Sequence, residues 1–355
     1  MTTFDSNLLK KWFLREKREL PWRQNPNPYS IWVSEVMLQQ TRVSVVIPYF
    51  ERWMTLFPTI EALARSPLDK VIKAWEGLGY YSRARNLHEG ARYVLEHYNG
   101  KLPEHEDDLK KIKGLGPYTI GAIRSFAFKQ KAPAVDGNVI RVLSRFFLVE
   151  EDTSKPKTIK KLWELASSIL PEEEPWIVNE ALIELGATLC ARKPKCSDCP
   201  LRKGCKAYEQ GLAEKIPFKS AKVKTEHLHR AVAVVIADGK LLVRRGKKGE
   251  IMSDLHEFPY IKCSTNRIDG LDFTKKIRRE FGLTVALEKE LKETAHSFTR
   301  YQVQLFPALF YCKKSVEIPG YQWLSLSELD SLAFSSGHRR IFEENREYIA
   351  ICSTS

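Results

Sequence analysis

Glu35 is the first residue of the chain whose type and surroundings could do chemistry. Asn27 followed by Pro28 joins a capping residue to the residue best suited to a first helical position, so the segment IWVSEVMLQQ is predicted to be helical. Glu35 shares a face of that helix with Ile31 and Leu38, and the nearby residues Val33, Val36 and Met37 are apolar. Burial there would raise the pKa of the carboxyl group, which suits a general acid near neutral pH. The alternative is a glutamate at the rim of the core, paired with an arginine.

Asp136 is a second carboxyl group with a possible chemical role. The segment AVDGNVIRVLSRFF predicts a short extended piece, then Asp136 at a helix start, then an apolar-periodic helix. As an N-cap it could be purely structural. The same placement favours the ionised form, because first-turn amides and the helix dipole both stabilise an anion. If the two carboxyl groups meet, a neutral Glu35 and a charged Asp136 form an acid together with a stabiliser of positive charge.

The segment LKKIKGLGPYTIGAI predicts a helix, a turn and a second helix opened by Pro117. Gly114 and Gly116 in the turn let backbone amides approach a ligand closely, and the second helix adds a favourable dipole for an anion. With Lys113 beside them, a DNA phosphate would fit. The alternative is a plain helix–turn–helix connection.

Four of the seven cysteines fall within one short segment, Cys190, Cys196, Cys199 and Cys205. In a reducing compartment such clustering indicates a metal site rather than disulfides. Four thiolates suit either a [4Fe–4S] cluster or a zinc ion, and the spacing alone leaves both open.

The chain of 355 residues is long enough for two domains. Residues 1–211 have helical periodicity, and the polar, lysine-rich residues 212–229 resemble a linker. Residues 230–350 contain β-rich runs around Asp238-Gly239, a two-residue hairpin signal, and the helix-like segment FTKKIRREFGL. This order predicts an all-α domain followed by an α+β domain.

The formal net charge of +13 indicates a polyanionic partner, either nucleic acid or an anionic membrane surface. No apolar run reaches the length of a membrane span, and the start MTTFDSNLLKKW lacks the pattern of a signal peptide. We therefore expect a cytoplasmic protein that is not a membrane protein, associated with the nucleoid if it is bacterial.

A set of motifs in fixed order resembles the MutY type of adenine DNA glycosylases, within the helix-hairpin-helix glycosylase superfamily. The motifs are LPWR (20–23), WVSEVMLQQT (32–41), GLGYYSRARNL (77–87), GLGPYTIGAI (114–123), VDGNV (135–139) and the cysteine cluster. The resemblance is close over about residues 4–210. It implies an all-α helix-hairpin-helix domain of two lobes with an iron–sulfur loop, followed by a Nudix-like α+β domain.

The resemblance also implies roles for individual residues. Glu35 matches the proton donor, and Asp136 matches the carboxylate that stabilises the oxocarbenium ion. Tyr118 stands where strand-cleaving relatives have a lysine nucleophile, and a phenol cannot form a Schiff base, so a monofunctional enzyme is expected. Gln40 and Tyr80 match residues that wedge into the base stack. Residues that match the adenine pocket are Leu20, Trp22, Arg23 and Glu180.

The four clustered cysteines match the ligands of a [4Fe–4S] cluster, although five residues separate the first two where the family usually has six. The second domain resembles the module that reads 8-oxoguanine opposite adenine. Phe298, Thr299 and Arg300 occupy the place where the family often has Phe-Ser-His. Of the metal-binding glutamates of a Nudix hydrolase the segment KKIRREFGL offers only Glu280, so nucleotide hydrolysis is not expected.

The implied partner is double-stranded DNA that carries adenine opposite 8-oxoguanine or guanine, and a monomer is expected. Two other functions are weighed against this one. The first is a thymine or oxidised-pyrimidine glycosylase of the endonuclease III kind, which Tyr118 and the second domain disfavour. The second is a non-catalytic, redox-sensing iron–sulfur protein that binds DNA, which the retention of both carboxyl groups disfavours.

Overall fold

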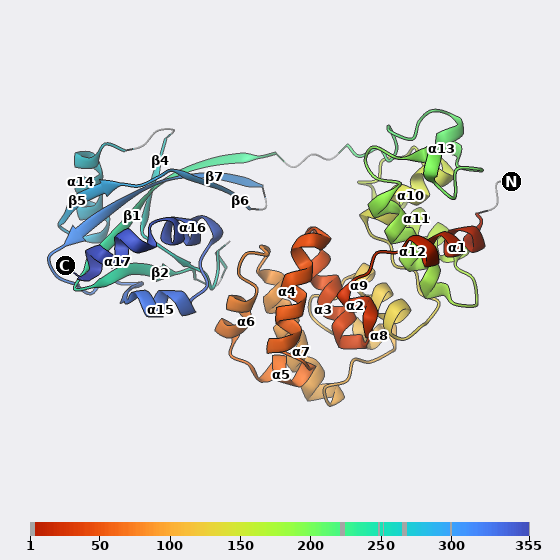
Figure 1. Cartoon of the computed structure of the whole chain (residues 1–355), viewed down its shortest axis with the longest axis horizontal. Coiled ribbons are helices and arrows are strands. Elements are labelled where there is room, and N and C mark those ends of the chain that lie inside the picture. Colours follow the sequence, from red (N-terminus) through yellow and green to blue (C-terminus); the bar gives the residue numbers. More distant parts are fainter. Residues whose placement is uncertain are drawn as a thin grey trace. The chain divides into compact units, whose positions relative to one another are not determined.

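A computed structural model describes residues 4–220, 224–247, 249–250, 252–264, 268–298 and 300–354 (Figure 1). The chain divides into two compact units. One, the helical unit, consists of residues 1–65 and 86–222, and the other, the C-terminal unit, consists of residues 66–85 and 223–355.

The described residues up to 220 form helices and no strand, as predicted. In chain order these helices are α1 (Ser6–Glu16), α2 (Pro21–Gln24), α3 (Pro28–Leu38), α4 (Val43–Leu56), α5 (Ile60–Arg65), α6 (Leu68–Ala74), α7 (Ser82–Tyr98), α8 (Glu106–Leu109), α9 (Pro117–Ala122), the π-helix η1 (Ile123–Ala127), α10 (Gly137–Phe147), α11 (Pro156–Ile169), α12 (Pro175–Thr188), the 3-10 helix η2 (Cys196–Asp198) and α13 (Lys206–Glu209).

Local sequence explains where the helices that carry the carboxyl groups begin. The Asn27 side chain accepts from the Ser30 amide at 2.9 Å, and the Ser30 hydroxyl accepts from the Asn27 amide at 3.0 Å, which makes a capping box for α3. In helix α1, Leu9, Trp12 and Phe13 are buried, while Leu8 is exposed. The helix predicted ahead of Gly114 is only the short α8, followed by turns.

The C-terminal unit is built on one eight-stranded mixed sheet with the order β3-β2-β1-β7-β5, in which β4 pairs with β1, β6 with β7 and β8 with β2. Its strands are β1 (Glu226–Ala237), β2 (Lys240–Arg245), β3 (His256–Glu257), β4 (Tyr260–Cys263), β5 (Val285–Glu290), β6 (Thr294–Phe298), β7 (Tyr301–Cys312) and β8 (Tyr321–Leu324). Strands β1 and β7 run parallel, and the predicted hairpin joins β1 to β2, with Asp238 and Gly239 at φ 49° and 70°.

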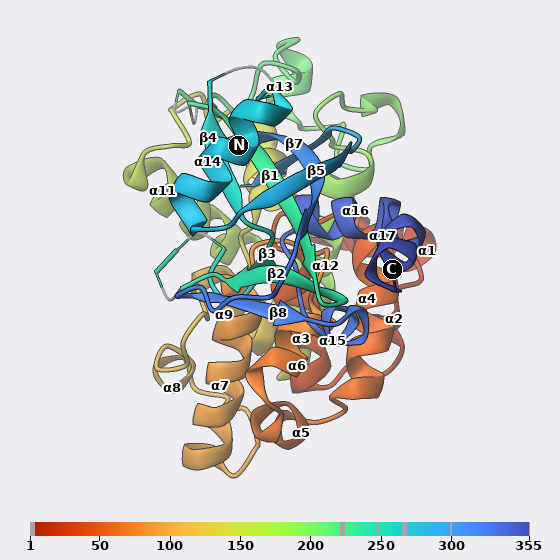
Figure 2. The ribbon, with the colours of Figure 1, turned by 90° about the vertical axis from the view of Figure 1, so that its left-hand side faces the viewer.

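Helices cover both faces of this sheet (Figures 1 and 2). Alternate residues of β1 point to opposite cores, so Val235 packs with helix α14 (Gly270–Phe281) and Val234 packs with the last helices of the chain. The remaining helices are α15 (Leu326–Ser331), α16 (Ser336–Glu344) and α17 (Arg346–Thr354). The predicted α+β fold is confirmed.

Two features differ from the domain limits predicted from sequence. The end of the predicted linker is ordered strand, because Glu226 to His229 pair with Tyr301 to Gln304 of β7. Residues 66–85, expected within the helical domain, form a compact unit with the C-terminal residues. None of the helices in the described part of the chain is both long and apolar enough to cross a membrane.

Gly121 in α9 provides a test of packing in the helical unit. A Cβ atom there would lie 2.0 Å from the Pro133 carbonyl oxygen, and backbone cannot give way cheaply. We expect Gly121→Ala to lower the free energy of unfolding by about 1–3 kcal/mol. Gly116→Ala is the control, because a Cβ there meets nothing within 4 Å and should cost less than about 1 kcal/mol. Urea unfolding followed by tryptophan fluorescence measures both, and equal losses would contradict the packing argument.

Candidate active site

A cavity of about 680 Å³ opens in the helical unit, lined by residues of α1, α2, α3, α9, α10 and α12. Glu35, Tyr118 and Asp136 all line it, although they come from separate parts of the chain. The two carboxyl groups singled out from sequence therefore share one cavity, as the proposed pairing requires.

Glu35 lies on a helix that is buried on all sides, because Tyr29 to Met37 are each buried. The Tyr118 hydroxyl donates a hydrogen bond to Glu35 Oε2 at 2.5 Å. The pKa of Glu35 is raised to about 7, mainly by burial and also by the nearby carboxyl groups of Asp136 and Glu180, while Tyr118 and Arg23 oppose the rise. Its hydrogen-bond partner is thus a phenol and not the arginine of the alternative interpretation. A carboxyl group with this pKa is partly protonated at neutral pH.

Asp136 caps α10, as predicted. Its carboxylate accepts from the Asn138 amide at 2.9 Å, the Val139 amide at 2.8 Å and the Asn138 side chain at 2.7 Å. These donors and Arg141 favour the charged form, but burial outweighs them and raises the pKa of Asp136 above its ordinary value. The Asp136 carboxylate accepts from three N–H donors, whereas Glu35 accepts from the Tyr118 hydroxyl. Hydrogen bonds therefore stabilise the charged form of Asp136 more than that of Glu35.

A chain of ion pairs fixes the wall formed by α12. Arg23 Nε lies 2.8 Å from Glu180 Oε2, and Arg23 Nη2 lies 3.0 Å from Glu184 Oε2. Glu184 is buried and also binds Arg18. Burial acts to raise the pKa of Glu184, but Arg18 and Arg23 together lower it. Glu184 was missed from sequence, although its place four residues after Glu180 puts it on the same helical face.

Three further residues of the helical unit were not found from sequence, and one of them, Lys129, lines the cavity. Buried Asn179 of α12 donates to the Ser125 hydroxyl at 2.8 Å and to the Ala132 carbonyl at 2.7 Å, which fixes the segment that leads to Asp136. Ser125 itself lies in η1, a π-helix, and such wide turns often occur near functional sites. Lys129 lines the cavity with its ammonium 5.0 Å from the Trp176 ring centre, and burial lowers its pKa. No local pattern identifies these long-range contacts.

The four clustered cysteines line a second, smaller cavity together with Arg145 and residues of the 190–205 loop. Arg145 Nη1 donates to Cys190 Sγ at 3.2 Å. Burial raises the pKa of Cys199 to about 12, and burial also raises the pKa values of Cys196 and Cys205. Among the described residues, no three Cys, His, Asp or Glu side chains meet closely enough to hold a single metal ion.

Comparisons with known proteins identify the family. Residues 33–168 match the HhH-GPD superfamily of base excision DNA repair proteins, and residues 231–344 match the NUDIX domain. The adenine DNA glycosylase of Mus musculus is 34% identical to this chain, over 98% of this chain and 79% of the mouse protein. The chain belongs to the adenine DNA glycosylase family. The adenine DNA glycosylase of Buchnera aphidicola subsp. Acyrthosiphon pisum is 32% identical, over 86% of this chain and 85% of that protein.

The solved structures add the fold of the helical part. A thermostable thymine-DNA glycosylase superposes with a TM-score of 0.53 at 30% identity, over 58% of this chain and 95% of that chain. The mouse adenine DNA glycosylase, in contrast, aligns along 98% of this chain, including the C-terminal unit.

Other residues that match this family's motifs fall into two groups. Leu20 and Trp22 are buried and line the large cavity, and exposed Gln40 lies at its wall with a left-handed backbone, φ 56°. Tyr80 belongs instead to the C-terminal unit. In the turn before α9, Gly114 has φ 88°, and a Cβ there would lie 2.6 Å from Asn86 Cβ.

The remaining predicted contacts with DNA are partly engaged within the chain. Lys113 Nζ forms an ion pair with Glu89 at 2.7 Å, whereas Gly116 is open. Phe298 packs on His296 and Tyr301, and Arg300 Nη2 lies 3.0 Å from Glu226 Oε1. Thr299 lies outside the described residues.

The raised pKa of Glu35 predicts how stability depends on pH. Below the ordinary pKa of 4.5 the carboxyl group is protonated in both states, so its contribution to stability is fully present. As pH rises from 4.5 to about 7, only the unfolded chain releases the proton, and about 3 kcal/mol is lost. Glu35→Gln keeps the shape and has no proton to lose.

Urea unfolding across this pH range should therefore show Glu35→Gln gaining stability relative to the parent as pH rises. Glu164→Gln, an exposed glutamate of α11, is the matched control and should show no such trend. A constant difference between Glu35→Gln and the parent would contradict the buried, protonated state.

Proposed function

We propose that this adenine DNA glycosylase removes adenine paired with 8-oxoguanine or guanine, and that it hydrolyses the N-glycosidic bond without cleaving the strand. The observation that carries the proposal is that one cavity is lined both by buried Glu35, hydrogen-bonded to Tyr118, and by Asp136, whose carboxylate accepts three hydrogen bonds from N–H groups. Because a base inside a duplex is out of reach, the adenine must be flipped out of the stack into this cavity.

Glu35 acts as the general acid. Adenine is a poor leaving group until it is protonated, and a carboxyl group with a pKa of about 7 retains its proton in a large fraction of molecules at neutral pH. Tyr118 binds Oε2, so Oε1 is available to carry the proton to N7 of the flipped base. Arg23 and Glu180 are held together beside it and offer hydrogen-bond groups to the edge of the base.

Asp136 stabilises the oxocarbenium ion that develops as the bond breaks, electrostatically or through a transient covalent bond, and water completes the reaction. Its three N–H donors hold the carboxylate in a fixed orientation toward the cavity. Tyr118 has a pKa raised well above its ordinary range by burial and by Glu35, so its hydroxyl remains a donor and does not act as a nucleophile.

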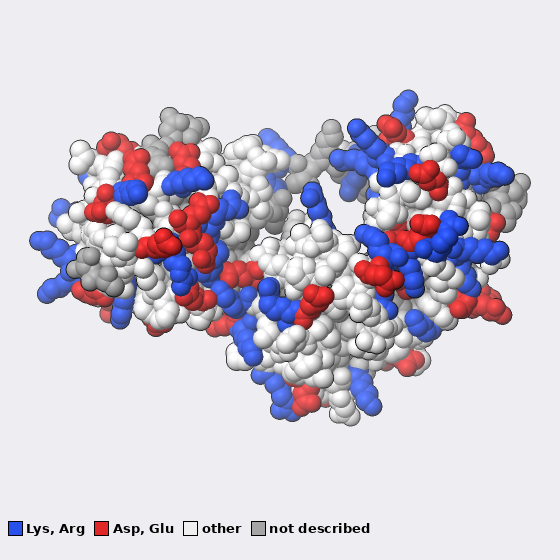
Figure 3. Space-filling model, viewed as in Figure 1, with Lys and Arg blue, Asp and Glu red and all other residues white. Residues whose placement is uncertain are grey.

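The C-terminal unit reads the base opposite the adenine. Phe298, Thr299 and Arg300 contact 8-oxoguanine, and because Phe298 is partly buried and Arg300 is paired with Glu226, the preference for 8-oxoguanine over guanine is modest. Gln40 and Tyr80 wedge into the stack, and Gly114, Gly116 and Lys113 approach a phosphate. Lysine and arginine side chains are interspersed with acidic ones over both units (Figure 3), and the net charge of +13 suits a duplex. The protein acts as a monomer.

Cys190, Cys196, Cys199 and Cys205 hold a [4Fe–4S] cluster. The supporting observation is the donor set, four thiols around one cavity with Arg145 directed at the Cys190 sulfur. When bound, the cluster supplies four strong bonds that would tie the loop together and a centre able to exchange an electron. Deprotonation of thiols whose pKa values are raised by burial would accompany its binding.

Excision of adenine tests the proposed activity. Under single-turnover conditions the parent should release adenine from duplexes with adenine opposite 8-oxoguanine or guanine, and not from adenine opposite thymine. Glu35→Gln should reduce the rate by at least about 100-fold while duplex binding persists. Above pH 7 the parent rate should fall about tenfold per pH unit, because the acid loses its proton.

Alkali treatment after the reaction reveals abasic sites, and Glu164→Gln serves as the control with an unchanged rate. Undiminished release by Glu35→Gln would rule out the acid assignment. Strand cleavage before alkali would indicate a lysine nucleophile, for which Lys129 is the lysine to test first.

Metal analysis tests the cofactor. The purified protein should be yellow-brown and contain about four irons per chain. Cys199→Ser should lose iron and colour, whereas Cys263→Ser, outside the loop, should retain both. A colourless parent protein with one zinc per chain would contradict the assignment.

A further inference from the structure

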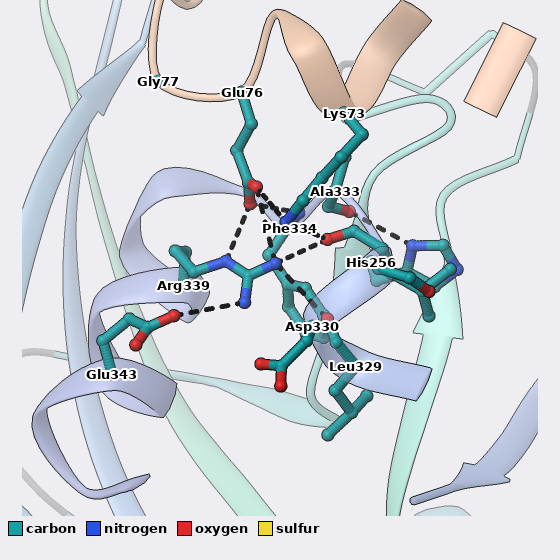
Figure 4. Close-up of polar contacts among 12 residues, drawn as sticks. Lys73, Glu76, Gly77, His256, Leu329, Asp330, Ala333, Phe334, Arg339 and Glu343 are labelled. Carbon is teal, nitrogen blue, oxygen red and sulfur yellow. Dashed lines mark hydrogen bonds and ion pairs between the residues drawn. The ribbon is translucent and has the colours of Figure 1, made fainter. Parts of the chain in front are cut away.

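Glu76 connects residues 66–85 to the rest of the C-terminal unit. Its carboxylate accepts from the Phe334 amide at 2.8 Å and from Arg339 Nε at 2.8 Å, and Lys73 Nζ lies 2.6 Å away (Figure 4). Lys73 also donates to the Leu332 carbonyl at 2.9 Å. Glu76 lies two residues after the end of α6, whereas Phe334 and Arg339 lie more than 250 positions later, between α15 and α16 and within α16.

This ion pair is largely removed from water. The side chain of Glu76 is 14% exposed and that of Arg339 is 16% exposed. The Arg339 guanidinium lies 4.8 Å from the centre of the Phe334 ring and also donates to the Leu332 carbonyl. Loss of one partner would leave the other charge poorly solvated, so the contact is worth more than a surface pair.

A second contact holds the other side of the same segment. Arg85, in the first turn of α7, donates from Nη1 to the Ser253 carbonyl at 3.1 Å and to Asp254 Oδ2 at 3.3 Å. Glu76 and Arg85 therefore bracket residues 77–81, which we call the Tyr80 loop. Hydrogen bonds therefore join the chain on both sides of this loop to residues 253–339 of the C-terminal unit.

Hydrogen bonds from Arg83 hold the backbone of the Tyr80 loop. Gly77, Gly79 and Tyr80 have φ values of 102°, 70° and 48°, and the last is unfavourable for a side chain with a Cβ. Arg83 Nη2 donates to the Leu78 and Gly79 carbonyls at 3.1 Å each. The Tyr80 ring is 40% exposed, with the Arg83 guanidinium 5.6 Å from its centre. An exposed aromatic ring on a fixed backbone can stack on bases at little entropic cost.

We propose that Glu76 and Arg339 are positioning residues, through which the later part of the C-terminal unit, residues 223–355, holds the Tyr80 loop in place for insertion into the DNA. The proposal rests on the proposed function in assigning Tyr80 to the base stack. It goes further because it gives residues 223–355 a second task, independent of the proposed contact of residues 298–300 with 8-oxoguanine. That task is to hold the Tyr80 loop, which the N-terminal half of the sequence encodes, in a fixed position.

Hydrogen–deuterium exchange of the full-length protein tests directly whether Glu76 and Arg339 hold the Tyr80 loop. Amides of residues 77–81 should exchange at least about tenfold faster in Glu76→Gln and in Arg339→Gln than in the parent. Arg346→Gln is the matched control, since it breaks a different ion pair, with Asp330, in the same layer of helices. Unchanged exchange in strand β7 verifies that each variant is folded. Equal protection of residues 77–81 in all four proteins overturns the proposal.

Extrusion of the target base tests the functional consequence. A duplex with 2-aminopurine in place of the target adenine brightens when that base leaves the stack. Glu76→Gln and Arg339→Gln should each lower the brightening and the single-turnover adenine release by about tenfold, with no further loss when combined. Neither should lower them further in a Tyr80→Ala background, because the wedge is already absent.

If the losses of adenine release caused by Glu76→Gln or Arg339→Gln add fully to the loss caused by Tyr80→Ala, the proposal is overturned, since the ion pair would then act at some place other than Tyr80. If the parent releases adenine from none of the duplexes, the proposed function fails instead, and the exchange experiment still decides whether Glu76 fixes the loop.

Discussion

The proton on Glu35 is the constraint on which the active site depends. A carboxyl group keeps a proton near neutral pH only when water is withheld from it, and here a helix buried on every side withholds the water. Helix α3 packs against α4, α9 and η1, and these elements together enclose the Glu35 carboxyl group. The same enclosure raises the pKa of Asp136, which keeps its capacity for charge through three N–H donors.

The other charges around the cavity are arranged so that they do not neutralise Glu35 by ion pairing. Arg23 is engaged by Glu180 and Glu184, and Arg18 also binds Glu184. The arginines therefore satisfy the carboxylates of α12, and only a weak attraction reaches Glu35. A direct Arg–Glu35 pair would have removed the proton that the chemistry needs.

Sequence predicted the features that short-range rules determine. The caps at Asn27 and Asp136 and the hairpin at Asp238-Gly239 follow from local residue types, and all three are found. It failed where the outcome depends on distant neighbours. Local donors favour the anion of Asp136, but burial, which the tertiary fold sets and the sequence does not show, outweighs them and raises its pKa. The contacts of Asn179 and Glu76 likewise join segments far apart in the chain and leave no local signature.

The division of the chain into units has a consequence for biosynthesis. Residues 66–85 leave the ribosome early, but the main partners of Glu76 are made 258 or more residues later. Helices of the first unit can assemble while translation continues, whereas this segment must wait for the last strands and helices. The parallel pairing of β1 with β7 delays the C-terminal sheet in the same way, because five strands and helix α14 lie between these two strands in the sequence. Until then the apolar surface of this segment stays exposed on the nascent chain, where chaperones can bind it. We expect the docking of residues 66–85 to be the slowest step in maturation.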